Sequence, residues 1–257
     1  MPEIRDERHK EMRIAVAGGT GWVGKLVVSA VREAGHEPRV ISRSEGVDLT
    51  TGRGLERALD GVERVIDASN IVTTGRSRSV AFFEAATSHL LRAGQAAGVS
   101  HHVVLSIVGI DRVDYGYYAG KRAQESLAAD SDVPSSVLRA TQFHEFAAQM
   151  LARGGPFAIA PRMRCQPVAA REVADALVEL ALGAPQGLAP DLAGPEERDM
   201  VQMVRQLHRA RGGRRPVLPL KLPGKVGREM VGGALLPTAP GPRGKTTFDE
   251  WVGAEAG

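Results

Sequence analysis

Tyr117 and Lys121 are the residues of this chain whose types and spacing most directly suggest chemistry. They lie four apart in the segment YGYYAGKRAQE, so on a helix both would face the same groove. A free tyrosine has a pKa of about 10 and transfers protons poorly at neutral pH, whereas a nearby ammonium favours the phenolate and lowers that pKa. The pair is therefore a candidate for proton transfer. Tyr115 and Tyr118 compete for the role, and Gly120 weakens the expected helix by about 1 kcal/mol relative to Ala.

A glycine-rich turn, AGGTGWVGKLV, is suited to the phosphates of a dinucleotide. Gly18, Gly21 and Gly24 give the spacing G-x-x-G-x-x-G, between a strand-like segment, MRIAVA, and a helical one, WVGKLVVSAVREAG. Gly18 would permit the tight turn, Gly21 would let a pyrophosphate approach backbone N–H groups, and Gly24 would let helix and strand pack closely. The residues between these glycines that we include in the predicted cofactor site are Thr20, Trp22 and Val23.

The same turn also comes close to the phosphate loop of ATP- and GTP-binding proteins, read through Gly19, Gly24 and Lys25. That loop needs a Ser or Thr hydroxyl after its lysine to hold Mg²⁺, and here Leu26 follows. Asp67 ends an apolar segment as a Walker-B aspartate would, but strands that end in Asp are common. We therefore favour the dinucleotide site.

The end of the second predicted strand indicates which dinucleotide would bind. In NAD-binding sites of this type an acidic residue about 20 positions further on holds the ribose 2′-hydroxyl. Here the segment VISRS places Ser42 and Arg43 at that point. A guanidinium can pair with the 2′-phosphate of NADP through two parallel hydrogen bonds, and a hydroxyl can add another. The sequence therefore favours NADP over NAD.

Short apolar runs alternate with segments of helical period, which is typical of a parallel sheet covered by helices. We predict strands over residues 12–17, 38–42, 46–49, 64–68, 102–107 and 135–139. We predict helices over residues 22–33, 54–59, 78–97 and 117–128, and then over 143–151, 171–182 and 200–209. The fold class is therefore α/β, a Rossmann-type doubly wound parallel sheet with a small C-terminal substrate lobe.

The chain divides into three predicted parts. Residues 1–11 are a loose arm, 12–183 form the NAD(P)-binding domain, with parts of the substrate pocket from 140 onward, and 184–257 form a small lobe and tail. In that tail Phe248 and Trp251 lie three apart and predict a helical turn that docks on the rest of the chain.

Composition sets limits on partners and location. The 257 residues are 43% hydrophobic, but no apolar run approaches the roughly 20 residues that span a bilayer, and the charged start MPEIRDERHKEM is unlike an export signal. We expect a cytoplasmic protein without a membrane partner. The basic segment 205–216 lacks interleaved aromatic residues, so we expect a solvated helix end and no nucleic-acid partner. Cys165 cannot form an internal disulfide and predicts inert packing, and no Cys/His pattern predicts a metal site.

The segments AGGTGWVG, ISRS, GVDLT, LSIVGID and YYAGK together resemble the short-chain dehydrogenase/reductase superfamily, and within it the atypical NmrA-like, NAD(P)-binding branch. The resemblance covers about residues 12–183. It implies that Asp48 and Leu49 lie beside the adenine. It also implies that the cofactor ribose is lined by Ala68, Ser69 and Asn70.

The resemblance also implies catalytic roles. Ser106 would hydrogen-bond the substrate oxygen, Tyr117 would deliver the proton to a carbonyl that receives hydride, and Lys121 would hold the ribose hydroxyls as well. Many members of this branch lack a working tyrosine and only bind the cofactor, so a purely structural role for the tyrosines stays open.

A second group of candidates follows the sixth predicted strand, in LRATQFHEF, because ligands of open α/β sheets bind at the carboxyl ends of the strands. Gln142, Phe143 and His144 are the predicted substrate-pocket residues. His144 has the pKa range for a proton relay, although a lone histidine is commonly structural.

The sequence therefore predicts an NADP-dependent oxidoreductase that moves hydride between the cofactor and a small carbonyl or quinone-like molecule. Two alternatives stay open. One is a catalytically silent NADP(H)-binding protein that senses redox state. The other is a nucleotide-sugar-type epimerase or dehydratase that uses the same tyrosine and lysine.

Overall fold

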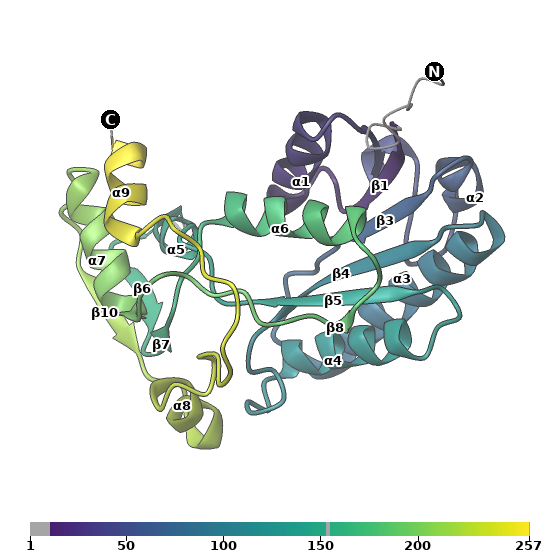
Figure 1. Cartoon of the computed structure of the whole chain (residues 1–257). Coiled ribbons are helices and arrows are strands. Elements are labelled where there is room, and N and C mark those ends of the chain that lie inside the picture. The colour runs from purple at the N-terminus through teal and green to yellow at the C-terminus, as the bar shows by residue number, and fades with distance from the viewer. Residues whose placement is uncertain (1–10, 153–154, 257) are drawn as a thin grey trace.

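A six-stranded parallel sheet forms the larger part of the computed structural model, which describes residues 11–152 and 155–256 (Figure 1). The strands run in the order β2-β1-β3-β4-β5-β8. Their bounds are β1 (Arg13–Ala17), β2 (Glu37–Ile41), β3 (Arg64–Asp67), β4 (His101–Ile107), β5 (Ser135–Ala140) and β8 (Gly187–Leu188). The predicted loose arm falls almost wholly outside the described residues.

Helices cover both faces of this sheet. One face carries α1 (Trp22–Glu33) and α6 (Ala170–Leu182), and the other carries α2 (Leu55–Leu59), α3 (Arg76–Ala96) and α4 (Gly116–Ala129) (Figure 1). The sequence of β1 shows why both faces close. Ile14 and Val16 pack in the core beneath α1 and α6, whereas Ala15 and Ala17, which alternate with them, pack in the core on the α2 side. A strand that is buried on both faces needs a continuous apolar run, and residues 14–17 of β1, IAVA, supply one.

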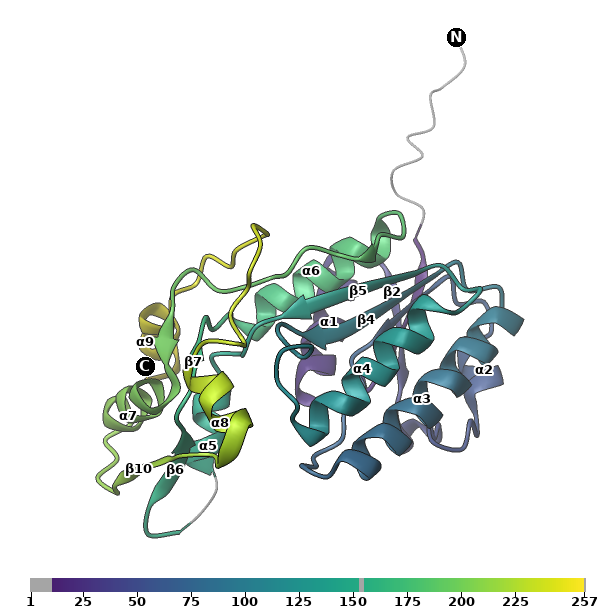
Figure 2. The same ribbon diagram turned by 90° about the horizontal axis from the view of Figure 1, so that it is seen from below.

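A smaller lobe lies beside the sheet (Figures 1 and 2). Its helices are α5 (Phe146–Ala152), α7 (Met200–Ala210), α8 (Gly224–Val231) and α9 (Phe248–Ala256). Its strands form a parallel pair, β6 (Ala158–Pro161) with β10 (Val217–Leu220), and an antiparallel pair, β7 (Arg164–Cys165) with β9 (Arg198–Asp199).

The chain passes more than once between the two parts. It leaves the main sheet after β5, forms α5, β6 and β7 in the lobe, returns for α6 and β8, and then completes the lobe. The boundary between the parts is therefore not a single point in the sequence. The tail returns as well, because Gly244 donates a backbone hydrogen bond to the Ala193 carbonyl (2.8 Å).

Most predicted elements are confirmed within a few residues, but the strand predicted over 46–49 is wrong. After β2 the chain forms a short 3-10 helix, η2 (Arg43–Glu45), which ends at Gly46 with a left-handed φ of 77°. Only an isolated bridge joins Asp48 to Arg53. A new parallel strand needs a crossover of about a dozen residues, and four residues after β2 cannot supply one.

The helix predicted over 143–151 begins later, at Phe146, because Phe143 instead forms a bridge with Val168. Within the part of the chain that the structure describes, no helix combines the length and the hydropathy that crossing a membrane requires.

Candidate functional site

The glycine-rich turn joins β1 to α1 in a conformation that only glycines allow. Gly18 has a φ of 74°, in the left-handed region. A Cβ on Gly24 would lie 2.0 Å from the Gly18 carbonyl oxygen, and one on Gly21 would lie 3.0 Å from the same atom. Gly24 therefore lets the helix approach the turn closely, as predicted from the spacing.

The start of α1 leaves backbone donors for a ligand. The first helical hydrogen bond runs from the Lys25 N–H to the Gly21 carbonyl (2.9 Å), so the N–H groups of Trp22, Val23 and Gly24 have no partner within the helix. The first turn holds no acidic residue, and Gly21 as the N-cap offers no side chain to fill the space. The turn therefore fits the pyrophosphate of a dinucleotide.

Ser42 and Arg43 follow the last residue of β2, the strand beside β1. Ser42 is buried, and its hydroxyl shares a 2.8 Å hydrogen bond with that of Ser44. Arg43 is exposed, and its guanidinium has no hydrogen-bond or ion-pair partner among residues 11–152 and 155–256. A cation at this strand end is thus available to an anionic group.

Asp48 and Leu49 lie in the loop after η2. The Asp48 carboxylate accepts hydrogen bonds from the backbone N–H (2.9 Å) and the hydroxyl (2.7 Å) of Thr50, which lower the pKa of Asp48. Leu49 is buried, and its carbonyl contacts His89 Nδ1 at 3.0 Å. Their predicted place beside the adenine stays a prediction.

The residues Ala68 to Asn70 leave the end of β3 beside the turn, since Ala68 donates its N–H to the Ala17 carbonyl (3.1 Å). Asp67 is fully buried and holds this segment, because its Oδ1 accepts the Ser69 N–H (2.9 Å) and its Oδ2 accepts Gln124 Nε2 (2.8 Å). This carboxylate organises the strand end and was not predicted to do so.

Tyr117 reaches this strand end from the first turn of α4. Its hydroxyl donates a 2.7 Å hydrogen bond to Oδ1 of Asn70, and its backbone carbonyl accepts the Ser79 hydroxyl (2.8 Å). Tyr115 and Tyr118 instead stack edge to face with centroids 5.3 Å apart, and Tyr118 packs in the lobe core. Of the three tyrosines, Tyr117 is thus the one that the structure connects to the predicted ribose-lining segment.

Lys121 points into the interior. Its Nζ donates to the Leu105 carbonyl (2.6 Å) and to Oε1 of Gln124, and lies 4.7 Å from the centre of the Phe83 ring. Burial lowers the pKa of Lys121 to about 8. Burial also raises the pKa of Tyr117 above its ordinary value, so the expected lowering of that pKa by the ammonium is wrong for this conformation.

Gly120 lies within α4 between these two residues, where packing requires a glycine. A Cβ there would lie 2.3 Å from the Ser79 hydroxyl and 2.7 Å from the Phe83 ring, so the glycine lets α4 pack closely against α3. The same approach brings Phe83 over Lys121. The glycine therefore helps to position Lys121, although it lowers the helix propensity of α4. The sequence alone indicates only the lower propensity.

Buried polar atoms that have no hydrogen-bond partner among the described residues lie at the carboxyl ends of β3, β4 and β5. They belong to Ser69, which follows β3, to Ser106 near the end of β4, and to Gln142, which follows β5. These ends lie along one edge of the sheet, which we call the strand-end edge, because the strands are parallel neighbours. A buried polar group that lacks a hydrogen bond costs about 1–3 kcal/mol, so this edge fits a polar ligand that supplies the missing partners.

An aromatic row links the glycine-rich turn to the smaller lobe. The Trp22 ring lies 5.9 Å from that of Phe143, which stacks on Phe146 at 5.7 Å. Trp22 is 42% exposed, and Phe143 and Phe146 are half-buried. The row forms an apolar border for the strand-end edge and places Phe143 beside the predicted cofactor turn.

His144 is fully buried and holds the tail. Its Nε2 lies 3.0 Å from the Thr246 carbonyl, and its ring packs 5.5 Å from Phe248 and 5.9 Å from Trp251. Burial lowers the pKa of His144. These contacts show that His144 anchors the tail, which docks as a helical turn as Phe248 and Trp251 predict. Its Nδ1 has no hydrogen-bond partner among the described residues, and its place in the substrate pocket stays a prediction.

Cys165 is also inert in this fold. It is fully buried, its Sγ lies 3.6 Å from the Met203 sulfur, and burial raises the pKa of its thiol to about 12. No cluster of three or more metal-ligating side chains occurs among the described residues.

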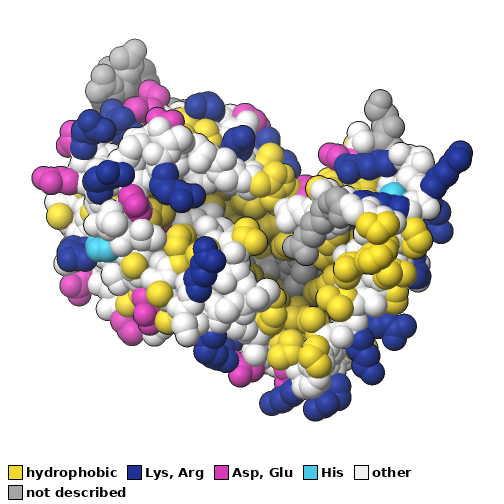
Figure 3. All heavy atoms as spheres, turned by 180° about the vertical axis from the view of Figure 1, so that it is seen from behind, with side chains coloured by type: hydrophobic (Ala, Val, Ile, Leu, Met, Phe, Trp, Pro, Cys, Tyr) yellow, Lys and Arg dark blue, Asp and Glu magenta, His cyan; other side chains and the backbone are white. Residues whose placement is uncertain are grey.

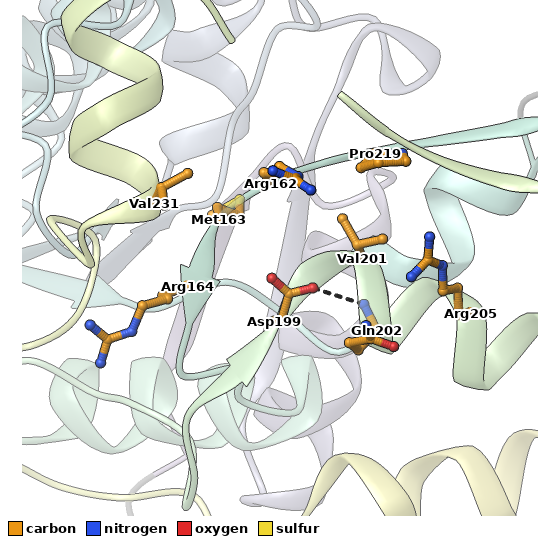
Figure 4. Close-up of a pocket in the computed structure, with 9 residues that line it drawn as sticks. All are labelled: Arg162, Met163, Arg164, Asp199, Val201, Gln202, Arg205, Pro219 and Val231. Atoms are coloured by element: carbon orange, nitrogen blue, oxygen red, sulfur yellow. Dashed lines mark hydrogen bonds between the residues drawn. The ribbon is translucent and has the colours of Figure 1, made fainter. Parts of the chain in front are cut away.

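A hollow of about 350 Å³ is lined by residues of the smaller lobe (Figure 4). Arg162, Arg164 and Arg205 border it, but Figure 4 shows their guanidinium groups apart around the rim. Arg164 pairs with Glu197 (2.5 Å) and Arg205 donates to the Val217 carbonyl (3.3 Å). The three guanidinium groups therefore do not converge on a common binding position in the hollow.

No family model matches the chain. Among curated proteins, (4-alkanoyl-5-oxo-2,5-dihydrofuran-3-yl)methyl phosphate reductase of Streptomyces griseus is 31% identical over 144 residues, which cover 51% of this chain and 48% of the relative. Ceramide reductase of Caulobacter vibrioides is 27% identical over 144 residues, which cover 49% of this chain and 44% of the relative. The chain thus spans about half the length of the curated relatives it matches.

Solved structures match nearly the whole chain. A short-chain dehydrogenase/reductase superfamily protein from Agrobacterium tumefaciens with bound NAD gives a TM-score of 0.69 at 18% identity, covering 95% of this chain and 96% of that one. UDP-glucose 4-epimerase from Thermotoga maritima, with UDP-glucose, gives 0.71 at 16% identity, covering 95% and 97%. These likenesses confirm the predicted Rossmann-type α/β fold. The chain is thus similar in fold to a short-chain dehydrogenase/reductase superfamily protein and in sequence to two reductases over about half of its length, and the NmrA-like branch stays a prediction.

Proposed function

We propose that this chain is an NADP-dependent oxidoreductase of the short-chain type that transfers hydride between the cofactor and a small carbonyl or quinone-like substrate. The observation that carries the proposal is the meeting of Tyr117 with Asn70 at the strand-end edge where Ser69, Ser106 and Gln142 leave polar atoms unpartnered. The reductase relatives from Streptomyces griseus and Caulobacter vibrioides agree with this reaction class.

The residues divide the work between binding and proton transfer. The N–H groups at the start of α1 would hold the pyrophosphate, and the cofactor, when bound, supplies or accepts the hydride. Ser106 would donate its unpartnered hydroxyl to the substrate oxygen. Tyr117 would exchange its bond to Asn70 for one to that oxygen and deliver the proton. Lys121 would favour the tyrosinate once its Nζ turns from the Leu105 carbonyl toward the edge.

Arg43 favours NADP over NAD. It is exposed and unpaired within the described segments, at the strand end where a 2′-phosphate would lie, whereas an acid there would repel that phosphate. The solved relative from Agrobacterium tumefaciens holds NAD, so the choice rests on the residues of this chain.

Calorimetric titration with NADPH and with NADH tests which cofactor the chain binds. We expect NADPH to bind more tightly, and Arg43→Asp to reverse the order, because the charge change acts on the 2′-phosphate alone. Arg57→Asp, an exposed arginine on α2, is the matched control and should keep the preference. Equal affinity of the parent protein for both cofactors would remove the assignment of NADP, and binding of neither would remove the oxidoreductase proposal.

A nucleotide-sugar epimerase or dehydratase is the second candidate, because the likeness to UDP-glucose 4-epimerase covers nearly all of the chain. It would use Tyr117 and Lys121 in the same way but would need a polar cavity for the sugar. Turnover of a UDP-sugar without net change of the cofactor would favour it. The third candidate is a catalytically silent redox sensor. Different affinities for NADP and NADPH, with no turnover of a panel of carbonyl compounds, would favour it.

A further inference from the structure

The parallel pair β6–β10 in the smaller lobe has an apolar face on each side, and the described residues cover only one of these faces. Ala158, Ala160 and Val217 point into the lobe core with α7. Their neighbours along the strands point the opposite way, and Ile159 and Leu218, which are register partners, are 46% and 43% exposed. An exposed sheet face ordinarily carries polar side chains, so this outer face is unusual for a surface in contact with water.

We call this outer face the lobe patch. It consists of Phe157, Ile159, Leu218 and Leu220. Figure 3, which views the molecule from behind, shows hydrophobic side chains gathered on the smaller lobe, beside the cleft that separates the lobe from the main sheet. Lys and Arg side chains lie along the outer border of the lobe. A contiguous apolar patch with a polar rim marks an interaction surface, whereas single exposed apolar residues do not.

The rim of the lobe patch is basic. Lys221 directly follows β10 at one end of the sheet. Arg214 precedes β10 at the other end. Both are exposed, and neither has a side-chain partner among the residues that the structure describes. Residues 155–162 contain no acid, and residues 212–233 contain only Glu229, which pairs with Lys225.

We propose that the lobe patch docks on the surface of an anionic lipid bilayer. Its apolar side chains would enter the boundary between headgroups and acyl chains, and its unpaired cations would contact the anionic headgroups. A second copy of the chain suits the surface less well, because two patches placed face to face would bring like charges together at both rims. The expectation of no membrane partner rested on the lack of a spanning segment, which a surface-bound protein does not need.

Sedimentation of the full chain with vesicles tests the proposal without any assay of catalysis. We expect the protein to sediment with vesicles of phosphatidylcholine and phosphatidylglycerol and to stay in solution with phosphatidylcholine alone. Arg214→Glu with Lys221→Glu should weaken the partition to anionic vesicles about 25-fold or more, since each basic residue near such a surface contributes about 1 kcal/mol, or roughly fivefold. Arg57→Glu, far from the patch, is the charge control and should change it little.

The apolar contribution is tested by Ile159→Ser with Leu218→Ser. Both side chains are half-exposed, so the variant should fold and yet lose binding that persists at high salt. Leu188→Ser, on the 60% exposed residue of β8, is the matched control. Failure of the parent to bind anionic vesicles would overturn the proposal, and so would unchanged binding of the Ile159/Leu218 variant. A dimer in solution that this variant dissociates would assign the patch to a second copy instead.

Discussion

The hydroxyl of Tyr117 and the side-chain oxygen of Asn70 are joined by a 2.7 Å hydrogen bond across the space between the first turn of α4 and the end of β3. The bond holds the tyrosine at the strand-end edge. If Tyr117 delivers the proton, Tyr117→Phe should lower kcat/KM about a hundredfold or more and leave NADPH affinity nearly unchanged. Steady-state kinetics and calorimetry measure the two effects, with Tyr115→Phe as the control. Equal losses in both tyrosine variants would contradict the assignment.

The charge of Lys121 should set the alkaline limit of activity. Burial lowers its pKa to about 8, so the ammonium, and with it the support of a tyrosinate, is lost above that pH. We expect kcat/KM to decline as pH rises through about 8. Lys121→Arg should lower activity but remove the decline, because a guanidinium keeps its charge. An unchanged alkaline limb in this variant would assign the decline to another group.

Stability should move in the opposite direction over the same range. Between about pH 8 and 10.5 the unfolded chain binds the Lys121 proton and the folded chain does not. The free energy of unfolding therefore gains a contribution from this residue as pH rises. Urea unfolding at several pH values measures it, and Lys121→Met should make the dependence shallower. A dependence that is unchanged in this variant would mean that the buried lysine keeps an ordinary pKa.

Gly24→Ala should lower the stability of the fold as well as the affinity for NADPH. The added Cβ would lie 2.0 Å from the Gly18 carbonyl oxygen, so helix and turn must separate. We expect the free energy of unfolding to fall by about 3 kcal/mol and NADPH binding to be lost. Gly253→Ala in α9 meets nothing within 4 Å and should be neutral or stabilising by up to about 1 kcal/mol. Normal stability of the Gly24 variant would show that the turn can relax.

Acid should loosen the tail. Burial holds the pKa of His144 below its ordinary 6.5, so below that pH the unfolded chain binds the proton more readily than the folded one. Stability is thus fully present above about pH 6.5 and falls as pH drops. Thermal melting of the parent and of His144→Gln between pH 7.5 and 5.5 measures the effect. We expect a shallower pH dependence in the variant, with a remainder from His101 and His102, whose pKa values burial also lowers.

Local pattern was enough to predict strands β1 to β5 of the main sheet, but not β8 at its edge. The helix predicted over 22–33 coincides with α1, because the glycine turn marks its start and its apolar residues recur at helical spacing. The two-residue strands β7 and β9 could not be predicted in this way. Arg164 pairs with Asp199 from a distant part of the chain, and so short a strand carries no periodicity of its own.

For the candidate site, the sequence predicted where residues lie along the helices and strands, but not which side chains they contact. Spacing placed Tyr117 and Lys121 on one helix, but the direction of the lysine depends on Gln124 and on the Leu105 carbonyl, which belong to the surrounding fold. His144 illustrates the opposite case. It lies at the predicted strand end, yet the tail covers it, because Phe248 and Trp251 return from the end of the chain.

The place of β8 has a consequence for how the molecule can be divided. This strand pairs with β5 and so closes one border of the main sheet, although it lies between two stretches of chain that build the lobe. A fragment that stops after α6 would leave the backbone groups of β5 open to pairing with a neighbouring molecule and would be prone to aggregate. The two parts should therefore melt in one cooperative transition, and neither should survive as an independent product of limited proteolysis.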